Sequence, residues 1–332
     1  MNFSFVLSTK CMHSFIELSK IFEEKFNTRH FPAHTKTLYD PAQYILQLGG
    51  KRVRPVSVLM GNELFDEITP DAYELGTAIE LFHNFTLIHD DIMDKAPVRR
   101  GLPTVHMKFG DSTALLAGDV MFVRCYDYLN KLKSTSFHKI LHIFNHTAAQ
   151  VCEGQQLDMD FEKRDTVSMD EYVNMITLKT SVLLAASLQL GSILGGTTER
   201  NQQHIYEFGK SLGIAFQIQD DYLDAFGDPE KFGKLVGGDI VANKKTFLMI
   251  RAMEVADEVS KNELMQLMRE NPVDKVEKVL AIFKKCDVDT WANELKEKYL
   301  QTALQHLEDI AVLSKRKEPL KQLALFLIER QN

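Results

Sequence analysis

Residues 88–94 read Ile-His-Asp-Asp-Ile-Met-Asp, and residues 218–224 repeat the pattern as Ile-Gln-Asp-Asp-Tyr-Leu-Asp. In each copy the first and last aspartates are four residues apart, which places them on one face of a helix. The second aspartate of each copy lies roughly a quarter-turn around that helix. The carboxylates concerned are those of Asp90, Asp91, Asp94, Asp220, Asp221 and Asp224.

Both motifs lie among apolar residues such as Leu87, Ile88 and Leu223, so their helices are expected to be partly buried. Like charges at this spacing destabilise a helix, and buried carboxylates need a compensating charge. A single motif could be a solvated acidic face, whereas two copies favour a site. Oxygen ligands without nearby cysteines indicate Mg²⁺ or Mn²⁺, which leaves positions open for phosphate oxygens. We therefore expect the two motifs to form comparable walls of a site for a metal-bridged polyphosphate.

Helical periodicity extends outward from these motifs over most of the 332 residues, and strand signals are scarce. No linker rich in Pro, Gly or Ser divides the chain, so residues 1–332 are predicted to form a single large all-α domain. Pro70, Gly110 and the pair Gly195-Gly196 supply helix boundaries. The predicted helices span about residues 12–27, 38–48, 52–65, 71–94, 112–132, 137–160, 170–194, 199–226 and 244–255, with three or four more before the end.

Composition narrows the class of protein. The 39 basic and 46 acidic residues give a net charge of −7, which argues against a general nucleic-acid binder. The four cysteines lie far apart in the sequence, as expected in a reducing compartment. The most apolar stretch, residues 182–194, is too short for a bilayer span, and no signal peptide is evident. A cytoplasmic protein without stable membrane insertion is expected.

Basic residues stand near both acidic motifs, although the protein is negative overall. Residues 49–55 read Gly-Gly-Lys-Arg-Val-Arg-Pro, in which glycines allow close approach to an anion and Arg54 can grip phosphate. Lys179 lies within an apolar helix, where a charged residue is rare unless it is paired or functional. Any one of these clusters alone could be an ordinary surface base. The other bases are Arg99, Arg100, Lys234, Lys244 and Lys245.

These motifs, in this order, resemble those of the trans-isoprenyl diphosphate synthases, also called polyprenyl synthetases. The resemblance covers about residues 44–250 and rests on residues 49–55, the two aspartate motifs, Arg99-Arg100-Gly101 and Lys179-Thr180. Phe216-Gln217 and Gly238-Asp239-Ile240 complete the pattern. We see no departure at a motif position. The first motif, without an insertion, and the small Thr86 before it resemble those of the short-chain group, the farnesyl and geranylgeranyl diphosphate synthases.

The resemblance implies an isoprenoid synthase-type fold around a deep central cavity, in a homodimer. It implies head-to-tail condensation of isopentenyl diphosphate with an allylic diphosphate, with three Mg²⁺ ions per site and Mn²⁺ as a substitute. Asp90, Asp94 and Asp220 would be direct metal ligands, supported by Asp91, Asp221 and Asp224. Bases would hold the diphosphates, and two polar residues would line the allylic cation. The implied residues are Lys51, Arg54, His83 and Arg100 for isopentenyl diphosphate, Arg99, Lys179, Lys234 and Lys244 for the allylic diphosphate, and Thr180 and Gln217 for the cation.

Residues that precede the first motif would set product length. Phe85 stands five residues before Asp90, and Phe82 one turn earlier, so their rings would form a floor under the growing chain. Both could instead be ordinary core aromatics. Thr86 is small, and the first motif carries no insertion, which favours a C15 or C20 product.

Two alternatives remain. A terpene cyclase would also carry an Asp-rich motif, but its second metal site usually mixes Asn, Ser or Thr with Glu. A non-catalytic regulatory subunit of a prenyl synthase would keep the fold and tend to lose one aspartate motif. Both motifs are intact here, and fold alone does not decide function.

Overall fold

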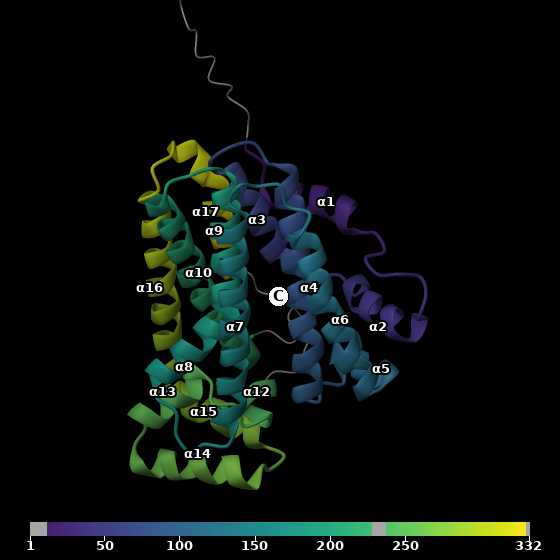
Figure 1. Cartoon of the computed structure of the whole chain (residues 1–332). Helices are drawn as coiled ribbons and strands as arrows, with labels where there is room; N and C mark the ends of the chain where they lie inside the picture. The colour runs from purple at the N-terminus through teal and green to yellow at the C-terminus, as the bar shows by residue number, and fades with distance from the viewer. Residues whose placement is uncertain (1–11, 228–236, 330–332) are drawn as a thin grey trace, which may run out of the picture. The chain divides into compact units, whose positions relative to one another are not determined.

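The computed structural model describes residues 12–227 and 237–329, and Figure 1 shows that these residues are almost entirely helical. The all-α prediction is confirmed. The helices are α1 (Phe15–Phe26), α2 (Lys36–Gln47), α3 (Val53–Glu63), α4 (Pro70–Met93), α5 (Val105–Phe109), α6 (Asp111–Leu129), α7 (Phe137–Glu162), α8 (Met169–Ile176), the π-helix η1 (Thr177–Ser181), α9 (Val182–Leu194), α10 (Glu199–Phe226), α12 (Gly238–Val241), α13 (Phe247–Val255), α14 (Glu258–Glu270), α15 (Lys275–Lys285), α16 (Val288–Glu308) and α17 (Ser314–Glu329).

The chain folds as two compact units. Unit 1 comprises Met1–Leu132 with Gly191–Thr197 and Val312–Leu320. Unit 2 comprises Lys133–Leu190, Thr198–Ala311 and Lys321–Asn332. The first aspartate motif lies in unit 1 and the second in unit 2. That residues 1–332 act as a single domain around one central cavity stays a prediction.

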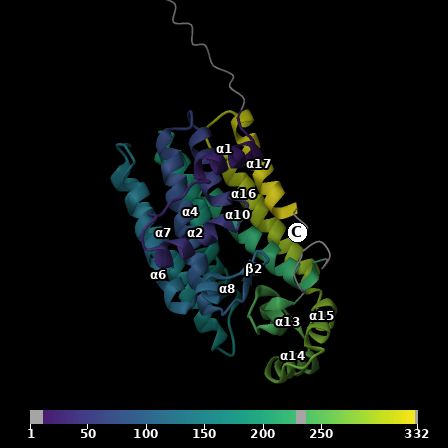
Figure 2. The same cartoon turned by 90° about the vertical axis from the view of Figure 1, so that its right-hand side faces the viewer.

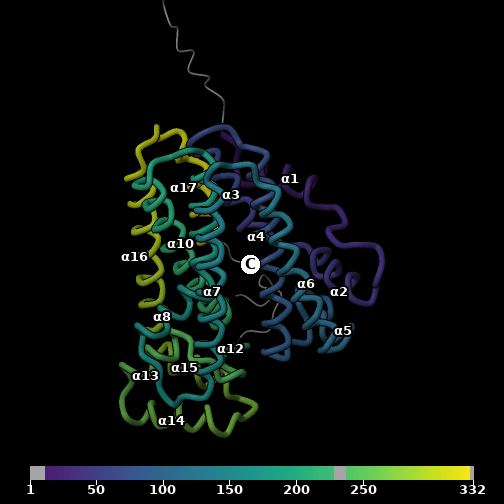
Figure 3. Tube along the Cα trace, in the orientation of Figure 1, coloured from purple at the N-terminus to yellow at the C-terminus, as the bar shows by residue number. Residues whose placement is uncertain are grey.

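Unit 1 is organised around α4, which contacts α3 and α6 and carries the first aspartate motif (Figure 3). Pro70 at the first position starts this helix, since its fixed φ suits the first turn. Close approach of α4 and α6 depends on Gly118, where an added Cβ would lie 2.3 Å from Nε2 of His89. The C-terminal end of α4 is thereby held against the side of α6.

Unit 2 is organised around α10, which packs along α16 and contacts η1 (Figure 1). Thr198 caps the start of α10 by accepting a hydrogen bond from the Asn201 backbone N–H. The helices α13, α14 and α15 lie together beyond the C-terminal end of α10, as Figure 2 shows. Their core includes Phe247, Phe283 and Val279, all almost fully buried.

Most predicted helices begin and end within a few residues of the observed ones, but some features were not predicted. Residues 170–194 form α8, η1 and α9 instead of one regular helix. The two-residue strands β1 (Val98–Arg99) and β2 (Leu102–Pro103) pair in an antiparallel hairpin. Short helices such as α5 and α12 have too few residues for a periodic signal.

Within the described residues, one helical stretch, Met169–Leu194, is long and apolar enough to cross a membrane by length and composition. Its most apolar part is 72% buried inside the fold. That degree of burial is typical of the core helix of a soluble protein. The stretch also contains the charged residue Lys179, which packs inside unit 2.

Candidate active site

The first aspartate motif lies at the C-terminal end of α4. Asp91 is only 2% exposed and forms a bidentate ion pair with Arg99, whose Nε and Nη2 donate to the carboxylate at 2.7–3.0 Å. The β1–β2 hairpin positions this arginine. Asp90 is half-buried, and Asp94 caps the helix in an exposed position. Because the C-terminal end of a helix carries partial negative charge, carboxylates here favour a bound cation.

The second motif repeats this placement in the last two turns of α10. Asp221 is 6% exposed and accepts hydrogen bonds from the Tyr172 hydroxyl and from Nε2 of Gln217, the latter at 2.8 Å. Burial, together with the charge of Asp239, raises the pKa of Asp221 to about 7. The carboxylate of Asp224 accepts the Asp239 backbone N–H at 2.9 Å. The motif is therefore tied to α8 and α12, and its acidic cluster would be stabilised by a cation.

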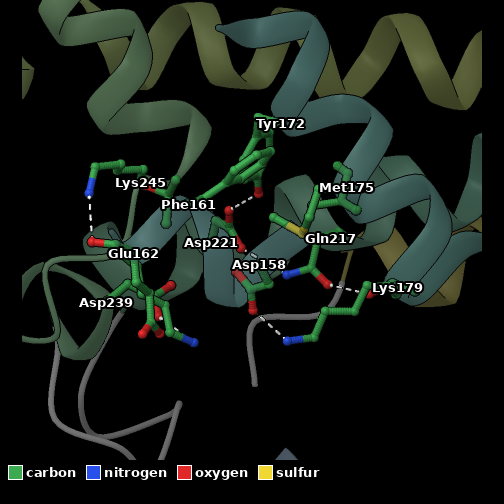
Figure 4. A pocket seen from close by; sticks show the side chains of 14 residues that line it. Asp158, Phe161, Glu162, Tyr172, Met175, Lys179, Gln217, Asp221, Asp239 and Lys245 are labelled. Carbon is green, nitrogen blue, oxygen red and sulfur yellow. Dashed lines mark hydrogen bonds and ion pairs between the residues drawn. The ribbon is translucent and has the colours of Figure 1, made fainter. Parts of the chain in front are cut away.

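Lys179 and Thr180 project from the π-helix η1, between α7 and α10. Nζ of Lys179 lies 2.5 Å from a carboxylate oxygen of Asp158, and the Thr180 hydroxyl donates to Oε1 of Gln217 at 3.2 Å. Figure 4 shows the Lys179–Asp158 pair beside the Tyr172–Asp221 contact. Gln217 therefore joins Thr180 to Asp221 in one hydrogen-bonded chain. A π-helical turn is often found at functional sites.

These groups line a pocket within unit 2 (Figure 4). Lys244, half-buried, forms an ion pair with Asp239 at 3.8 Å. Burial lowers the pKa of the neighbouring Lys245. The wall therefore carries both acidic and basic side chains, which suits an anion bridged to the carboxylates by a metal. The polar lining residues are Asp158, Glu162, Tyr172, Lys179, Thr180, Gln217, Asp221, Asp239, Lys244, Lys245 and Thr246.

In unit 1 a second group of basic residues follows Gly49 and Gly50. Nη1 of Arg54 lies 3.1 Å from Nε2 of His83, and Arg100 donates to the carbonyl of Gly49. Burial, and next the positive charge of Arg54, lower the pKa of His83 well below its usual value, so its ring is neutral. Burial and the charge of Arg100 lower the pKa of Arg54 to about 10.

This group carries excess positive charge. Arg52 is buried against Glu80, whereas Arg54 contacts a neutral imidazole. The buried Nε of Arg54 has no hydrogen-bond partner within the described residues. A buried donor of this kind is costly unless a ligand accepts from it. Gly50 has a φ of 143°, a backbone conformation that favours glycine, and the Arg100 guanidinium packs directly against it. The group therefore fits an anion such as a phosphate.

The aromatic residues expected to limit product length form a cluster between α4 and α6. The ring of Phe85 stacks on Phe122 with centroids 5.0 Å apart and lies 5.7 Å from that of Phe82. Phe122 also contacts Tyr126 edge-on at 5.5 Å. The Thr86 hydroxyl donates to its own helix at the His83 carbonyl, 2.8 Å away. Phe82 is almost fully buried and Phe85 is half-buried, so Phe85 is the more accessible of the two rings.

The structure thus brings together, within unit 2, Lys179, Thr180, Gln217 and the second motif, and within unit 1, Arg54 with His83 and Asp91 with Arg99. Lys234 lies outside the described residues. Sequence reasoning assigned no role to Asp158, Tyr172, Asp239 or Phe122. In the sequence, the only feature that could have indicated a role for Asp158 is its position one turn after Gly154 in α7, and this is a weak signal.

Comparisons with known proteins show which family the sequence and the fold resemble. The protein-family model for polyprenyl synthetase matches residues 35–285. A geranylgeranyl diphosphate synthase from Saccharolobus solfataricus is 37% identical over 328 residues, which cover 95% of this chain and 98% of that protein. A crystal structure of a geranylgeranyl pyrophosphate synthase is similar with a TM-score of 0.91 at 42% identity, covering 97% of this chain and 100% of that one. The corresponding enzyme of Pyrococcus horikoshii gives a TM-score of 0.89 at 34% identity, covering 95% and 98%.

Proposed function

Because this chain belongs to the polyprenyl synthetase family, we propose that it is a prenyltransferase that condenses isopentenyl diphosphate with an allylic diphosphate, head to tail. The product is a short-chain all-trans prenyl diphosphate. The names of the relatives favour the C20 product, geranylgeranyl diphosphate, over the C15 product, farnesyl diphosphate.

One observation carries this proposal. Each aspartate motif lies at the C-terminal end of a helix, and each unit also holds a basic side chain in an ion pair. In unit 1 Arg99 pairs with Asp91, and in unit 2 Lys179 pairs with Asp158. Such sites can bind a diphosphate through both metal ions and guanidinium or ammonium groups. A terpene cyclase would not need the additional anion group at Arg54, and a non-catalytic subunit would not need both motifs.

The donor set fits Mg²⁺, on which this family generally depends. It consists of hard carboxylate oxygens, and their placement at helix C-terminal ends favours a cation. Asp90, Asp94 and Asp220 would hold three ions, with Mn²⁺ as a substitute, and Asp91, Asp221 and Asp224 would orient these ligands. When bound, Mg²⁺ would neutralise charge on the departing diphosphate.

The chain's own residues bind and orient the two substrates. Arg99, Lys179 and Lys244, with Lys234, would contact the allylic diphosphate, and their charges would stabilise it as its carbon–oxygen bond breaks. Arg54 would hold isopentenyl diphosphate together with Lys51, His83 and Arg100, through an Nε that has no hydrogen-bond partner in the part of the chain that the structure describes. Thr180 and Gln217 would present oxygens to the allylic cation. The isopentenyl double bond then attacks that carbon, and loss of one proton to the released diphosphate restores a neutral alkene.

The remaining expectations are proposals of the same kind. We place the enzyme in the cytoplasm as a homodimer, with both motifs of one chain facing a single cavity in one domain. Phe85 and Phe82 would close that cavity below the first motif, with the small Thr86 admitting a chain of C15 to C20.

A product assay tests the proposal. Purified protein is given isopentenyl diphosphate with dimethylallyl, geranyl or farnesyl diphosphate, with Mg²⁺ or with excess EDTA. We expect Mg²⁺-dependent C20 diphosphate, and C15 diphosphate would correct only the chain length. Release of a cyclic hydrocarbon would favour the cyclase, and folded protein inactive with every starter would favour a regulatory subunit. Either result would overturn the proposed reaction.

A further inference from the structure

Two histidines from different helices of unit 2 lie unusually close together. His204 is in the second turn of α10 and His306 is in the last turn of α16. Their Nδ1 atoms are 3.3 Å apart, and their ring centroids are 5.6 Å apart. Asp309, which caps the C-terminal end of α16, offers a carboxylate oxygen within 4.8 Å of both ring nitrogens. Both histidines are half-buried and Asp309 is exposed.

The proposed reaction does not use this cluster. His204 precedes Asp220 by 16 residues on the same helix, a separation of about 24 Å along its axis. The cluster is therefore distinct from the aspartate motif of α10. Packing alone gives a poor reason for two Nδ1 atoms to face each other, because one ring must then donate a proton to the other ring's lone pair.

The geometry matches the coordination shell of a small transition-metal ion. Zinc binds imidazole nitrogen at about 2.0–2.1 Å, so two ligand atoms of a tetrahedral site lie about 3.3–3.4 Å apart. The observed Nδ1–Nδ1 distance of 3.3 Å equals that edge. An exposed aspartate can complete a third position by a change of side-chain rotamer. Nε2 of Gln305 donates to Oδ1 of Asp309 at 3.1 Å and would orient it as a supporting group.

Electrostatics favours a cation at the same place. His306 and Asp309 lie at the C-terminal end of the 21-residue helix α16, where the helix carries partial negative charge. Two imidazoles with one carboxylate suit Zn²⁺ or Co²⁺, whereas Mg²⁺ prefers a shell of oxygen ligands. The site would therefore select a different metal from the aspartate motifs.

We propose that His204, His306 and Asp309 bind one Zn²⁺ ion, with water in the fourth position, and that this ion joins the start of α10 to the end of α16. The ion stabilises unit 2 and takes no part in prenyl transfer. The site depends only on these residues and does not rest on the proposed function.

The test is a Zn²⁺ titration of the full-length protein, with Mg²⁺ in large excess to occupy the aspartate motifs. We expect one equivalent of Zn²⁺ to bind and the melting temperature to rise by at least about 3 °C. Co²⁺ should give the visible absorption of a tetrahedral site. His306→Gln should abolish both signals, and Asp309→Asn, an exposed and structurally mild change, should weaken Zn²⁺ binding at least about tenfold.

The matched control is His142→Gln. His142 is an exposed histidine of α7, with His138 and His146 four residues away on either side, and these are the competing surface site for Zn²⁺. The control should bind Zn²⁺ as the unchanged protein does. Normal binding by both His306→Gln and Asp309→Asn would overturn the proposal, as would loss of binding in His142→Gln alone.

Discussion

Gly154 of α7 lies directly against the backbone of Lys179, such that a Cβ added to the glycine would be 2.2 Å from the lysine nitrogen. On the other side of η1, Gly213 of α10 approaches Ser181, where an added Cβ would be 2.7 Å from the Ser181 Cα. The π-helical turn is thus held between two helices that can approach it only at glycines. This packing brings the Lys179 ammonium to Asp158 and the Thr180 hydroxyl to Gln217.

Gly154→Ala should therefore displace Lys179 and lower activity. Overpacking of this kind destabilises a protein by about 1–3 kcal/mol. We expect kcat/KM for the allylic diphosphate to fall at least about tenfold, since small misplacements of a positioned group have large effects. Steady-state kinetics and urea denaturation of the variant measure both effects.

The neighbouring substitution Glu153→Ala is the control, because Glu153 is exposed on the same helix. It should leave both activity and stability close to those of the unchanged protein. If Gly154→Ala loses stability and keeps full kcat/KM, the π-helical turn does not position Lys179 for catalysis.

The aromatic cluster between α4 and α6 predicts how product length responds to substitution. Phe85→Ala and Phe122→Ala should each lengthen the product by one or more C5 units, because the two rings stack on one another at 5.0 Å. Thr86→Phe should shorten it, since a ring would then stand nearer to the aspartates. Chromatography of the dephosphorylated products measures chain length directly.

Phe137→Ala removes a half-buried ring from α7 and serves as the control for loss of an aromatic residue elsewhere. Its product distribution should not change. An unchanged distribution in Phe85→Ala as well would mean that this ring is an ordinary core residue and not the floor.

The sequence predicted those elements of the fold that are determined by local pattern. The helix predicted over residues 199–226 is observed as Glu199–Phe226, because Thr198 caps its start and its apolar positions recur with helical spacing. The aspartate motifs could be recognised for the same reason. Each motif lies at the C-terminal end of its helix, where a cation is favoured. This placement could be recognised only from the observed helix ends.

The features that were not predicted depend on contacts between distant residues. The π-helical turn within residues 170–194 packs against Gly154 and Gly213, and neither contact leaves a periodic signal in the sequence. Asp158 and Lys179 are 21 residues apart and meet only when α7 packs on η1. Phe122 likewise joins the aromatic cluster only through the packing of α6 on α4.

A buried lysine supports the segment that carries Lys244. Nζ of Lys275, which is 2% exposed, donates to the side-chain oxygens of Asn243 and Asn271, the latter at 3.2 Å. Asn243 has a positive φ of 58° and directly precedes Lys244. Lys275→Met should remove the donor that fixes this strained residue and so misplace the neighbouring ammonium group. We expect KM for the allylic diphosphate to rise several-fold, with a smaller change in kcat.

Lys278→Met on the same helix is the matched control, since Lys278 is exposed and pairs with Asp274. It should leave both kinetic constants unchanged. Equal kinetics in the two variants would assign Lys275 to stability alone.

The buried His30 of unit 1 should lower the free energy of unfolding in mild acid. The imidazole is 3% exposed, its Nε2 lies 2.8 Å from the Phe26 carbonyl, and its Nδ1 lies 2.7 Å from the Tyr128 hydroxyl. Burial lowers the pKa of His30 below its ordinary value of 6.5. Above pH 6.5 the ring is neutral in both the folded and the unfolded chain, so its contribution to stability is fully present. As the pH falls below 6.5, the unfolded chain binds a proton that the folded one does not.

Urea denaturation between pH 7.5 and pH 5 should therefore show a falling free energy of unfolding, to which His30 contributes at most about 1.4 kcal/mol per pH unit. His30→Gln should flatten this dependence and should also lower stability at pH 7.5, because ring packing against Phe26 is lost. The exposed neighbour His34, changed to Gln, should keep the slope of the unchanged protein. An identical slope in His30→Gln and the unchanged protein would show that other groups cause the acid sensitivity.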